Sequence, residues 1–276
     1  MNTSSPAAQT SLLPTLFVSH GAPLFALDAG TSGPALRAYG QRMEPQNLKG
    51  IVVMSPHWMT NGVKVMSGEA PGTLHDFGGF PKELYALNYP APGAPALAHE
   101  VGTLLHAAGI EATEDATRPF DHGTWVPLMH LFPKANIPVI QVSLPIGASP
   151  ADITGLGRAL QPLRARGILV LGSGSMTHNL AEFFGGEPKA APYVDAFSRW
   201  VEQTLERGDV GALQDYVRQA PSALRAHPSD DHFLPLFFAL GAASAEGAKF
   251  KPEYLTREVR YGMLAMDSFA LHAVGT

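Results

Sequence analysis

Short apolar runs restrict this chain of 276 residues to a fold built around a buried β-sheet. The runs cover residues 12–19, 50–55, 137–144 and 167–174. The run at 50–55 is rich in β-branched residues and apolar up to its last position, which favours a strand covered on both faces. Such a sheet requires helices on its two sides.

Helix-like stretches are interspersed with these runs. They cover residues 94–108, 150–166 and 193–207, and Ser149 is suited to be the N-cap of the second. Strands that alternate with helices predict an α/β fold. We expect a single domain with a central, mostly parallel or mixed sheet flanked by helices.

The expected domain organisation is simple. Residues 1–13 are predicted to be a flexible N-terminus, and residues 14–276 one folded domain. The segment 71–95 is rich in Pro and Gly, but its aromatic residues predict an ordered loop that packs on the domain rather than a linker.

The chain contains eleven histidines and no cysteine. Five histidines lie in short contexts rich in Gly, Pro, Ser or Asp: His20, His57, His122, His178 and His232. In α/β sheets, ligands bind beyond the carboxyl ends of the strands. His20, His57 and, after a Gly-Ser turn, His178 follow predicted strands, so we predict that three imidazoles share one edge of the sheet.

The lack of cysteine excludes disulfides, thiolate zinc sites and thiol nucleophiles. Imidazole is a common metal ligand and the side chain whose ordinary pKa lies nearest neutrality. A transition-metal site here would consist of imidazole and carboxylate ligands, which favours Fe(II), Mn(II) or Zn(II). The remaining histidines would then be available for proton transfer.

The sequence allows more than one role for His232. An apolar run at 233–243 follows it and predicts a buried helix, which Ser229 or Asp230 would cap. His232 is a candidate metal ligand with an aspartate beside it. The spacing leaves open whether His227 or an aspartate replaces or supplements His232.

Two further contexts have both a structural and a functional interpretation. His122 lies between Asp121 and Gly123, which indicates either a turn or an imidazole held by a carboxylate for proton transfer. The stretch 172–175 before His178 is only loosely similar to a phosphate-binding loop and lacks its lysine, which argues against nucleotide binding.

Charge and hydropathy exclude several classes of protein. The formal net charge of -5 argues against general nucleic-acid binding, which needs clustered Lys and Arg. No apolar stretch reaches the roughly 18–20 residues of a membrane helix. The beginning of the chain lacks the basic and apolar parts of a signal peptide. We expect a cytoplasmic protein without nucleic-acid or membrane partners.

A family resemblance rests on seven motifs between about residues 14 and 270. These are SHGAP (19–23), SPHW (55–58), LHDFGGFP (74–81), YPAPG (89–93), FDHGTW (120–125), GSGSMTHNL (172–180) and DHFLPL (231–236). In these motifs the chain resembles the LigB-type (class III) extradiol aromatic ring-opening dioxygenases, in particular their 4,5-DOPA extradiol dioxygenase-like branch.

The resemblance implies a non-haem Fe(II) enzyme that uses O2 to open the ring of a catechol, DOPA-like or related, beside its two hydroxyl groups. His20, His57 and His232 match the metal ligands of that branch. His178 matches its catalytic acid/base, and His122 matches a second active-site histidine. The expected partners are a small catechol and O2, and the expected assembly is a monomer or small homo-oligomer.

Aromatic side chains in the motifs are expected to hold the flat ring. The predicted substrate contacts are His75, Trp58, Phe80 and Trp125, with Phe77 in the same wall. Arg118 and Lys82 are candidates for binding a substrate carboxylate because they are close to the motifs in the sequence.

One position departs from the wider superfamily. Its better-known members hold iron with two histidines and one glutamate, whereas His232 matches the glutamate position here. Such a site is also expected to accept Zn(II) in purified protein. Two alternatives remain open, a zinc-dependent hydrolase that uses the same histidines and a non-enzymatic binding protein on this fold. The sequence lacks the His-Glu-x-x-His signature, which counts against the hydrolase.

Overall fold

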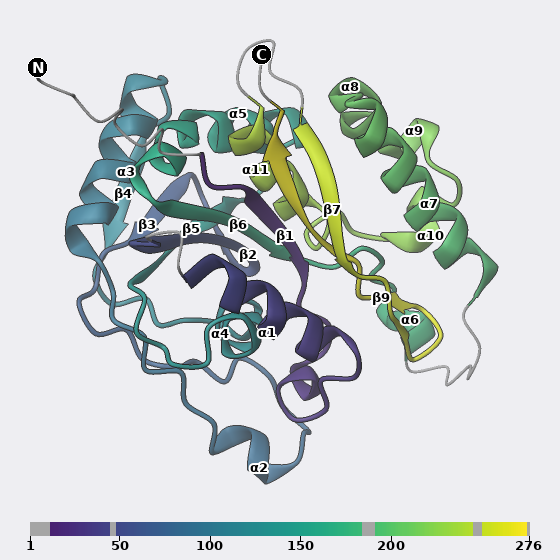
Figure 1. Ribbon diagram of the computed structural model, residues 1–276, viewed down its shortest axis with the longest axis horizontal. Helices are drawn as coiled ribbons and strands as arrows, with labels where there is room; N and C mark the ends of the chain where they lie inside the picture. The colour runs from purple at the N-terminus through teal and green to yellow at the C-terminus, as the bar shows by residue number, and fades with distance from the viewer. Residues whose placement is uncertain (1–11, 45–47, 184–190, 245–249, 275–276) are drawn as a thin grey trace, which may run out of the picture.

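The computed structural model describes residues 12–44, 48–183, 191–244 and 250–274, and its centre is a mixed sheet between helices (Figure 1). Eight strands form this sheet in the order β4-β3-β5-β2-β6-β1-β10-β7. Their bounds are β1 Thr15–Ser19, β2 Gly50–Thr60, β3 Val63–Met66, β4 Ala112–Asp115, β5 Val139–Pro145, β6 Ile168–Gly174, β7 Phe250–Thr256 and β10 Ser268–Ala273. A separate hairpin pairs β8 (Val259–Arg260) with β9 (Leu264–Ala265).

The four central strands, β5, β2, β6 and β1, are parallel to one another. They correspond to the four predicted runs, and every residue of β1 and β6 is buried. The edge pairings of β3 with β5 and of β10 with β1 and β7 are antiparallel, which makes the sheet mixed. The predicted α/β fold class is therefore confirmed.

Strand β2 is longer than the predicted run 50–55. Its pairing with β5 shifts register between Met54 and Met59, so the strand continues through an irregular stretch that contains Pro56. Proline has no N–H to donate, and such irregularities bend a strand and redirect its side chains. His57 consequently lies inside the irregular end of β2 rather than after it.

Helices cover both faces of the sheet (Figure 1). Helices α3, α5 and α11 lie on one face, α1 and α4 lie on the other, and α7 packs beside β7. The helix bounds are α1 Ser32–Met43, α2 Lys82–Tyr85, α3 Pro95–Ala107, α4 His122–Leu131, α5 Pro150–Ala159, α6 Leu180–Phe183, α7 Pro192–Arg207, α8 Val210–Gln214, α9 Tyr216–Gln219, α10 Ala223–Ala226 and α11 Leu234–Ala243, with 3-10 turns η1 Pro23–Ala26 and η3 Gln161–Arg166.

The helix predicted over 150–166 is split in two. Ser149 caps α5 as expected, in a reciprocal pair of hydrogen bonds with Asp152. Helix α5 ends at Ala159, and η3 begins at Gln161 with a proline in its first turn. A proline at that point cannot donate to the preceding turn, so the α-helix does not continue through it.

Two further expectations concern the chain outside the regular elements. Residues 1–11 of the predicted flexible N-terminus lie outside the described residues, whereas Leu13 is buried and its N–H donates to the Arg164 carbonyl at 3.4 Å. In the segment 71–95, Tyr89 is buried and its hydroxyl donates to the Phe132 carbonyl at 3.0 Å, so this segment packs on the domain. Within the described ranges, no helix has the length and apolar character needed to cross a bilayer.

Helices α5 and α11 approach so closely that glycines are required between them. A Cβ placed on Gly157 would lie 2.1 Å from the Phe238 carbonyl oxygen, and one on Gly241 would lie 2.1 Å from the Thr154 carbonyl oxygen. The opposing atoms are backbone, which cannot rotate away. This contact fixes α11 against the layer that covers the sheet.

The contact predicts opposite outcomes for two glycines in α5. Gly157→Ala should destabilise the protein by roughly 1–3 kcal/mol because the new methyl group clashes with α11. Gly155→Ala is the control, since a Cβ there has no atom within 4 Å, and it should stabilise by about 0.5–1 kcal/mol through helix propensity. Urea unfolding measures both, and equal effects of the two substitutions would contradict the close contact.

Candidate active site

Three of the five singled-out histidines come from neighbouring parallel strands. His20 directly follows β1, His57 lies in the irregular end of β2, and His178 follows β6. Strands β2, β6 and β1 are adjacent, so their carboxyl ends reach the same edge of the sheet. The imidazoles of His20 and His57 meet there with ring centroids 5.1 Å apart.

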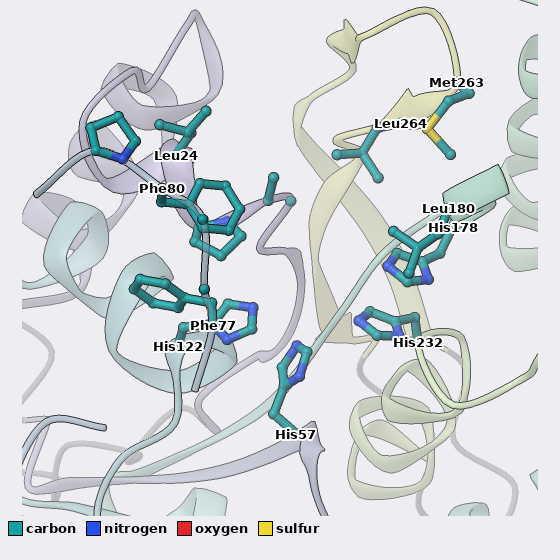
Figure 2. Close-up of a pocket in the computed structure, with 16 residues that line it drawn as sticks. Leu24, His57, Phe77, Phe80, His122, His178, Leu180, His232, Met263 and Leu264 are labelled. Atoms are coloured by element: carbon teal, nitrogen blue, oxygen red, sulfur yellow. The ribbon is translucent and has the colours of Figure 1, made fainter. Parts of the chain in front are cut away.

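The other two histidines are delivered by the starts of helices. His122 is the first residue of α4, whose N-cap Asp121 accepts a hydrogen bond from the Thr124 N–H at 3.1 Å. His232 lies two residues before the start of α11. Both helix starts point at the same edge of the sheet, and the side chains of His57, His122, His178 and His232 converge in Figure 2.

The position of His232 depends on a glycine in β6. A Cβ on Gly174 would lie 2.2 Å from the His232 carbonyl oxygen, and this oxygen accepts a hydrogen bond from the Ser175 N–H at 2.8 Å. Only a residue without a side chain allows the chain before α11 to approach the strand this closely. The glycines in the stretch 172–175 therefore make room for α11, in agreement with the argument against a phosphate loop.

The five rings form one continuous cluster. The His57 ring lies 3.9 Å from the His122 ring and 5.0 Å from the His232 ring, centroid to centroid. The His178 ring stacks on the His232 ring at 3.5 Å with an interplanar angle of 7°. His20 lies 5.4 Å from His232. The prediction that His20, His57 and His178 share one edge of the sheet agrees with this arrangement.

Hydrogen-bond acceptors fix the tautomers of two of these rings. The Ser173 hydroxyl donates its single hydrogen to the Gly123 carbonyl, so at its 3.0 Å contact with His20 Nδ1 it accepts. His122 Nδ1 lies 3.0 Å from Oδ1 of Asp76, and a carboxylate only accepts. Both rings therefore carry their proton on Nδ1 and present an unprotonated Nε2 to the cluster.

His232 is held in the same manner, and His57 is not. His232 Nδ1 lies 2.6 Å from Oδ2 of Asp231 and donates to it, which leaves Nε2 of His232 unprotonated. His57 Nδ1 is 3.9 Å from the Asp76 carboxylate, too far for a hydrogen bond. His57 Nε2 faces His20 Nε2 at 3.1 Å. The pair therefore either shares one proton or directs two lone pairs at a common point.

Two of these anchoring residues were not assigned a role from the sequence. Ser173 lies within β6, where it reads as part of a buried strand. Asp76 lies in the motif 74–81, where His75 was the residue singled out. The signal that identifies Asp76 is chemical, because a carboxylate inside a histidine-bearing motif is a natural acceptor for an imidazole N–H. Neither hydrogen bond could be predicted from sequence spacing, since the two partners, such as Asp76 and His122, are distant in the chain.

Burial lowers the pKa of three of the imidazoles. Burial is the main cause that lowers the pKa of His20 and of His57 well below the ordinary value, and the neighbouring histidines lower both further. Burial, followed by the charge of His232, lowers the pKa of His178 to about 3. Neutral imidazoles are the form that binds metal ions and accepts protons.

The carboxylates beside the cluster stay charged. Burial alone would raise the pKa of Asp76, but its hydrogen bonds with His122 outweigh burial and hold the pKa below the ordinary value. The same balance at Asp231, with His232 as the donor, lowers its pKa. These anions orient the rings and increase the basicity of the opposite nitrogens.

The ring nitrogens are suited to hold a metal ion. His20, His57 and His122 form a group whose ligand atoms lie within 4.8 Å of one another. Two nitrogens bound to one ion at about 2.1 Å lie roughly 3.0–3.4 Å apart in octahedral or tetrahedral geometry, and the Nε2 atoms of His20 and His57 are 3.1 Å apart. The imidazoles fit a metal ion, and this distance grouping contains His122 where the sequence prediction has His232.

A cavity of about 610 Å³ opens above the cluster (Figure 2). His57, His122, His178 and His232 line it. The rest of its wall is apolar or glycine and consists of Gly21, Ala22, Pro23, Leu24, Phe77, Gly78, Gly79, Phe80, Pro81, Leu180, Met263 and Leu264. Its size falls in the range of small-molecule sites.

Of the four predicted substrate contacts, one lines the cavity and the other three do not. Phe80 lines the cavity, together with Phe77. Trp125 is fully buried and its Nε1 donates to the Leu74 carbonyl at 3.0 Å, behind the cavity wall. His75 donates through Nε2 to the Leu87 carbonyl at 3.1 Å, and Trp58 is buried beneath the Arg118 guanidinium. His75, Trp58 and Trp125 are not among the residues that line the cavity.

The remaining candidate residues for substrate or metal binding also lie outside the cavity wall. Arg118 donates to the His57 carbonyl at 3.1 Å and to Asp121 at 2.9 Å, which makes it a support of the site rather than part of the wall. Lys82 lies at the start of α2 and is exposed. His227 is buried and its ring contacts the Met176 carbonyl at 2.9 Å, whereas His232 lines the cavity.

The sequence of the chain matches a family model along most of its length. The model is described as the catalytic LigB subunit of aromatic ring-opening dioxygenase, and residues 14–265 match it. The chain belongs to the LigB family. As a member of this family it is a ring-cleaving dioxygenase of the extradiol type, as the resemblance predicted.

Several curated relatives cover the LigB chain almost completely. A protein named 4,5-DOPA dioxygenase extradiol from Beta vulgaris is 36% identical over 95% of this chain and 97% of its own length. A protein of the same name from Escherichia coli (strain K12) is 37% identical over 83% of this chain and 85% of its own length. The crystal structure of an uncharacterized protein from Escherichia coli K12 superposes with a TM-score of 0.77 at 31% identity, covering 94% of this chain and 99% of that one.

The neutral histidines predict how stability depends on pH. Because the folded pKa values of His20, His57 and His178 lie below the ordinary value of 6.5, the unfolded chain binds protons that the folded chain does not. The contribution of these histidines to the free energy of unfolding of the metal-free protein is therefore fully present above about pH 6.5. It decreases as the pH falls from 7 to 5. Each histidine held neutral contributes about 1.4 kcal/mol per pH unit below its unfolded pKa.

Urea unfolding of the metal-free protein between pH 7 and 5 tests this dependence. His178→Gln should reduce the slope of the free energy of unfolding against pH by roughly the contribution of one proton. His99→Gln is the matched control and should leave the slope unchanged, since the His99 side chain is 83% exposed and solvated in both states. A stability that does not change between pH 7 and 5 would contradict the neutral cluster.

Proposed function

We propose that this LigB-family protein is a non-haem Fe(II)-dependent extradiol dioxygenase that opens the ring of a catechol-type substrate, DOPA-like or related, with O2. The observation that supports it is the convergence of five imidazoles, four of which form the floor of an apolar cavity. The names of the relatives, 4,5-DOPA dioxygenase extradiol, agree with a catechol substrate.

His20, His57 and His232 are proposed to hold the metal. His20 and His232 each have an anchored Nδ1 and an unprotonated Nε2, and His57 Nε2 faces His20 Nε2. Three ligands on one side of an ion leave positions for substrate and O2 on the other. Fe(II), when bound, would bind both the catechol oxygens and O2, and it would allow electron density to pass from the catechol to O2.

His178 is proposed to be the acid/base. Its ring stacks on His232, so a catechol oxygen at the metal would lie beside it. Burial keeps its pKa low, and the neutral ring can accept the proton of the second hydroxyl group. The same ring nitrogen returns this proton to the oxygen that leaves as the ring opens. His178 thus carries one proton between two stages of the reaction.

His122 is proposed to handle a second proton. Its Nδ1–H is held by Asp76, so Nε2 is the atom that faces the cavity cluster. Asp76 fixes the ring through Nδ1, so Nε2 of His122 can exchange a proton with the oxygen that attacks the ring. Apolar walls around the site exclude water from these exchanges.

Replacement of His178 tests the acid/base role. His178→Ala should keep its metal, because His178 is outside the proposed ligand set, and should lower the rate of ring opening by about 10²–10⁴-fold. Metal content after dialysis and the yellow absorbance of the semialdehyde product measure the two effects. His99→Ala is the exposed control and should match the parent protein, whereas full turnover by the His178 variant would eliminate the assignment.

The third metal ligand is tested by a pair of variants. His232→Ala should lose tight metal binding, while His122→Ala should keep it and slow ring opening. Metal content after anaerobic loading with Fe(II), and separately with Zn(II), gives the answer. Retention by His232→Ala together with loss by His122→Ala would instead assign the third ligand to His122, in accord with the distance grouping.

The competing functions are separated by one anaerobic experiment on the parent protein. The apoprotein is loaded with Fe(II), mixed with a panel of catechols and exposed to O2. Ring opening supports the proposal. Hydrolysis of esters or amides by the Zn(II) form, without ring opening by the Fe(II) form, would support a zinc hydrolase, and no turnover of either kind would support a binding protein. A cytoplasmic monomer or small homo-oligomer stays a prediction.

A further inference from the structure

We propose that the cavity of this protein selects catechols with an uncharged, apolar side chain over catechols with a zwitterionic side chain, such as DOPA. This inference rests on the proposed function, because it assumes that the two hydroxyl groups of the substrate face the histidines. It concerns the part of the substrate that points away from them.

The wall that faces this part of the substrate is apolar on both sides. Leu24 and Phe80 lie on one side of the cavity in Figure 2, and Leu180, Met263 and Leu264 lie on the other, with the histidines below. A ring seated on the histidines would direct its substituent between these two sides. The volume of about 610 Å³ leaves room beyond a single aromatic ring.

Charged side chains are missing from this wall as far as the structure describes it. Within the described ranges, the lining includes no lysine, arginine, aspartate or glutamate. Its ionisable groups are the four histidines at the floor, and the proposed function uses all of them. A substrate ammonium or carboxylate placed against this wall would lose its hydration without gaining an ionic partner.

Two arginines close to the site in the fold are already engaged with carboxylates. Arg118 donates to the His57 carbonyl and to the buried Asp121. Arg225 lines a neighbouring hollow that shares Met263 with the cavity, and its Nε donates to Glu182 at 2.7 Å. Both guanidinium groups would have to give up a carboxylate to bind a substrate carboxylate.

Apolar substituents should bind more tightly to this wall than charged ones. Each methylene group buried against the wall should tighten binding roughly fourfold, which corresponds to about 0.8 kcal/mol at 25 °C. L-DOPA and 4-propylcatechol have the same number of side-chain carbons and differ only in the ammonium and carboxylate. They therefore form a matched pair for the test.

The test measures binding and turnover separately. Calorimetric titration of the Fe(II)-loaded protein without O2 gives Kd for 4-methylcatechol, 4-ethylcatechol, 4-propylcatechol and L-DOPA. We expect Kd to fall along the alkyl series and to be at least tenfold higher for L-DOPA than for 4-propylcatechol. After O2 is admitted, kcat/KM should follow the same order.

Leu180 allows the wall to be changed at the cavity mouth. Its side chain lines the cavity and the residue is 53% exposed, so Leu180→Arg can add a cation without burying it. This variant should lower the ratio of the Kd for 3-(3,4-dihydroxyphenyl)propionate to that for 4-propylcatechol by several-fold. Leu224→Arg, at a 68% exposed position of α10 outside the cavity, is the matched control and should leave the ratio unchanged.

The outcomes distinguish this inference from the proposed function. Ring opening of L-DOPA with a Kd and kcat/KM equal to or better than those of 4-propylcatechol would overturn the selectivity and leave the proposed function intact. Catechols that bind in the expected order but are never opened would support the selectivity and contradict the dioxygenase activity. A protein that binds none of the catechols would overturn both.

Discussion

The candidate site depends on the backbone contact between the chain that enters α11 and the end of β6. Gly174 lets the His232 carbonyl lie against the strand, and the Ser175 N–H donates to that carbonyl. The same strand supplies Ser173, which holds His20, and is followed by His178. A bulkier residue in place of Gly174 would push α11 away and separate His232 from the other rings, because the opposing atom is a backbone oxygen that cannot rotate aside.

Around this contact, three of the five rings are each oriented by a group that lies outside the cluster. Ser173, Asp76 and Asp231 accept from the Nδ1–H groups of three histidines, and the opposite nitrogens turn toward a shared space. Burial lowers the pKa of His20, while the hydrogen bonds with His122 and His232 hold the pKa values of Asp76 and Asp231 low. Orientation and protonation state thus have one physical origin, and both suit metal binding.

Much of the fold followed from patterns within short segments. The central strands and the helices α3, α7 and α11 are close to their predicted bounds, because buried β-branched runs and longer apolar or amphipathic stretches are local signals. The differences are local as well. Pro56 accompanies an irregular extension of β2, and a proline splits the helix predicted over 150–166 into α5 and η3. Such interruptions depend on which hydrogen bonds the neighbouring elements offer.

The fold class and the five histidines could be predicted from the amino-acid sequence, because strand ends and helix starts follow from local composition and from Gly and Pro positions. The groups that surround the histidines follow instead from the packing of distant elements. His122 is held by Asp76 and not by the adjacent Asp121, which caps α4 and binds Arg118 instead. Trp125 is turned into the core while Phe80 reaches the cavity. The direction of a side chain depends on how distant elements pack, and spacing along the chain does not contain that information.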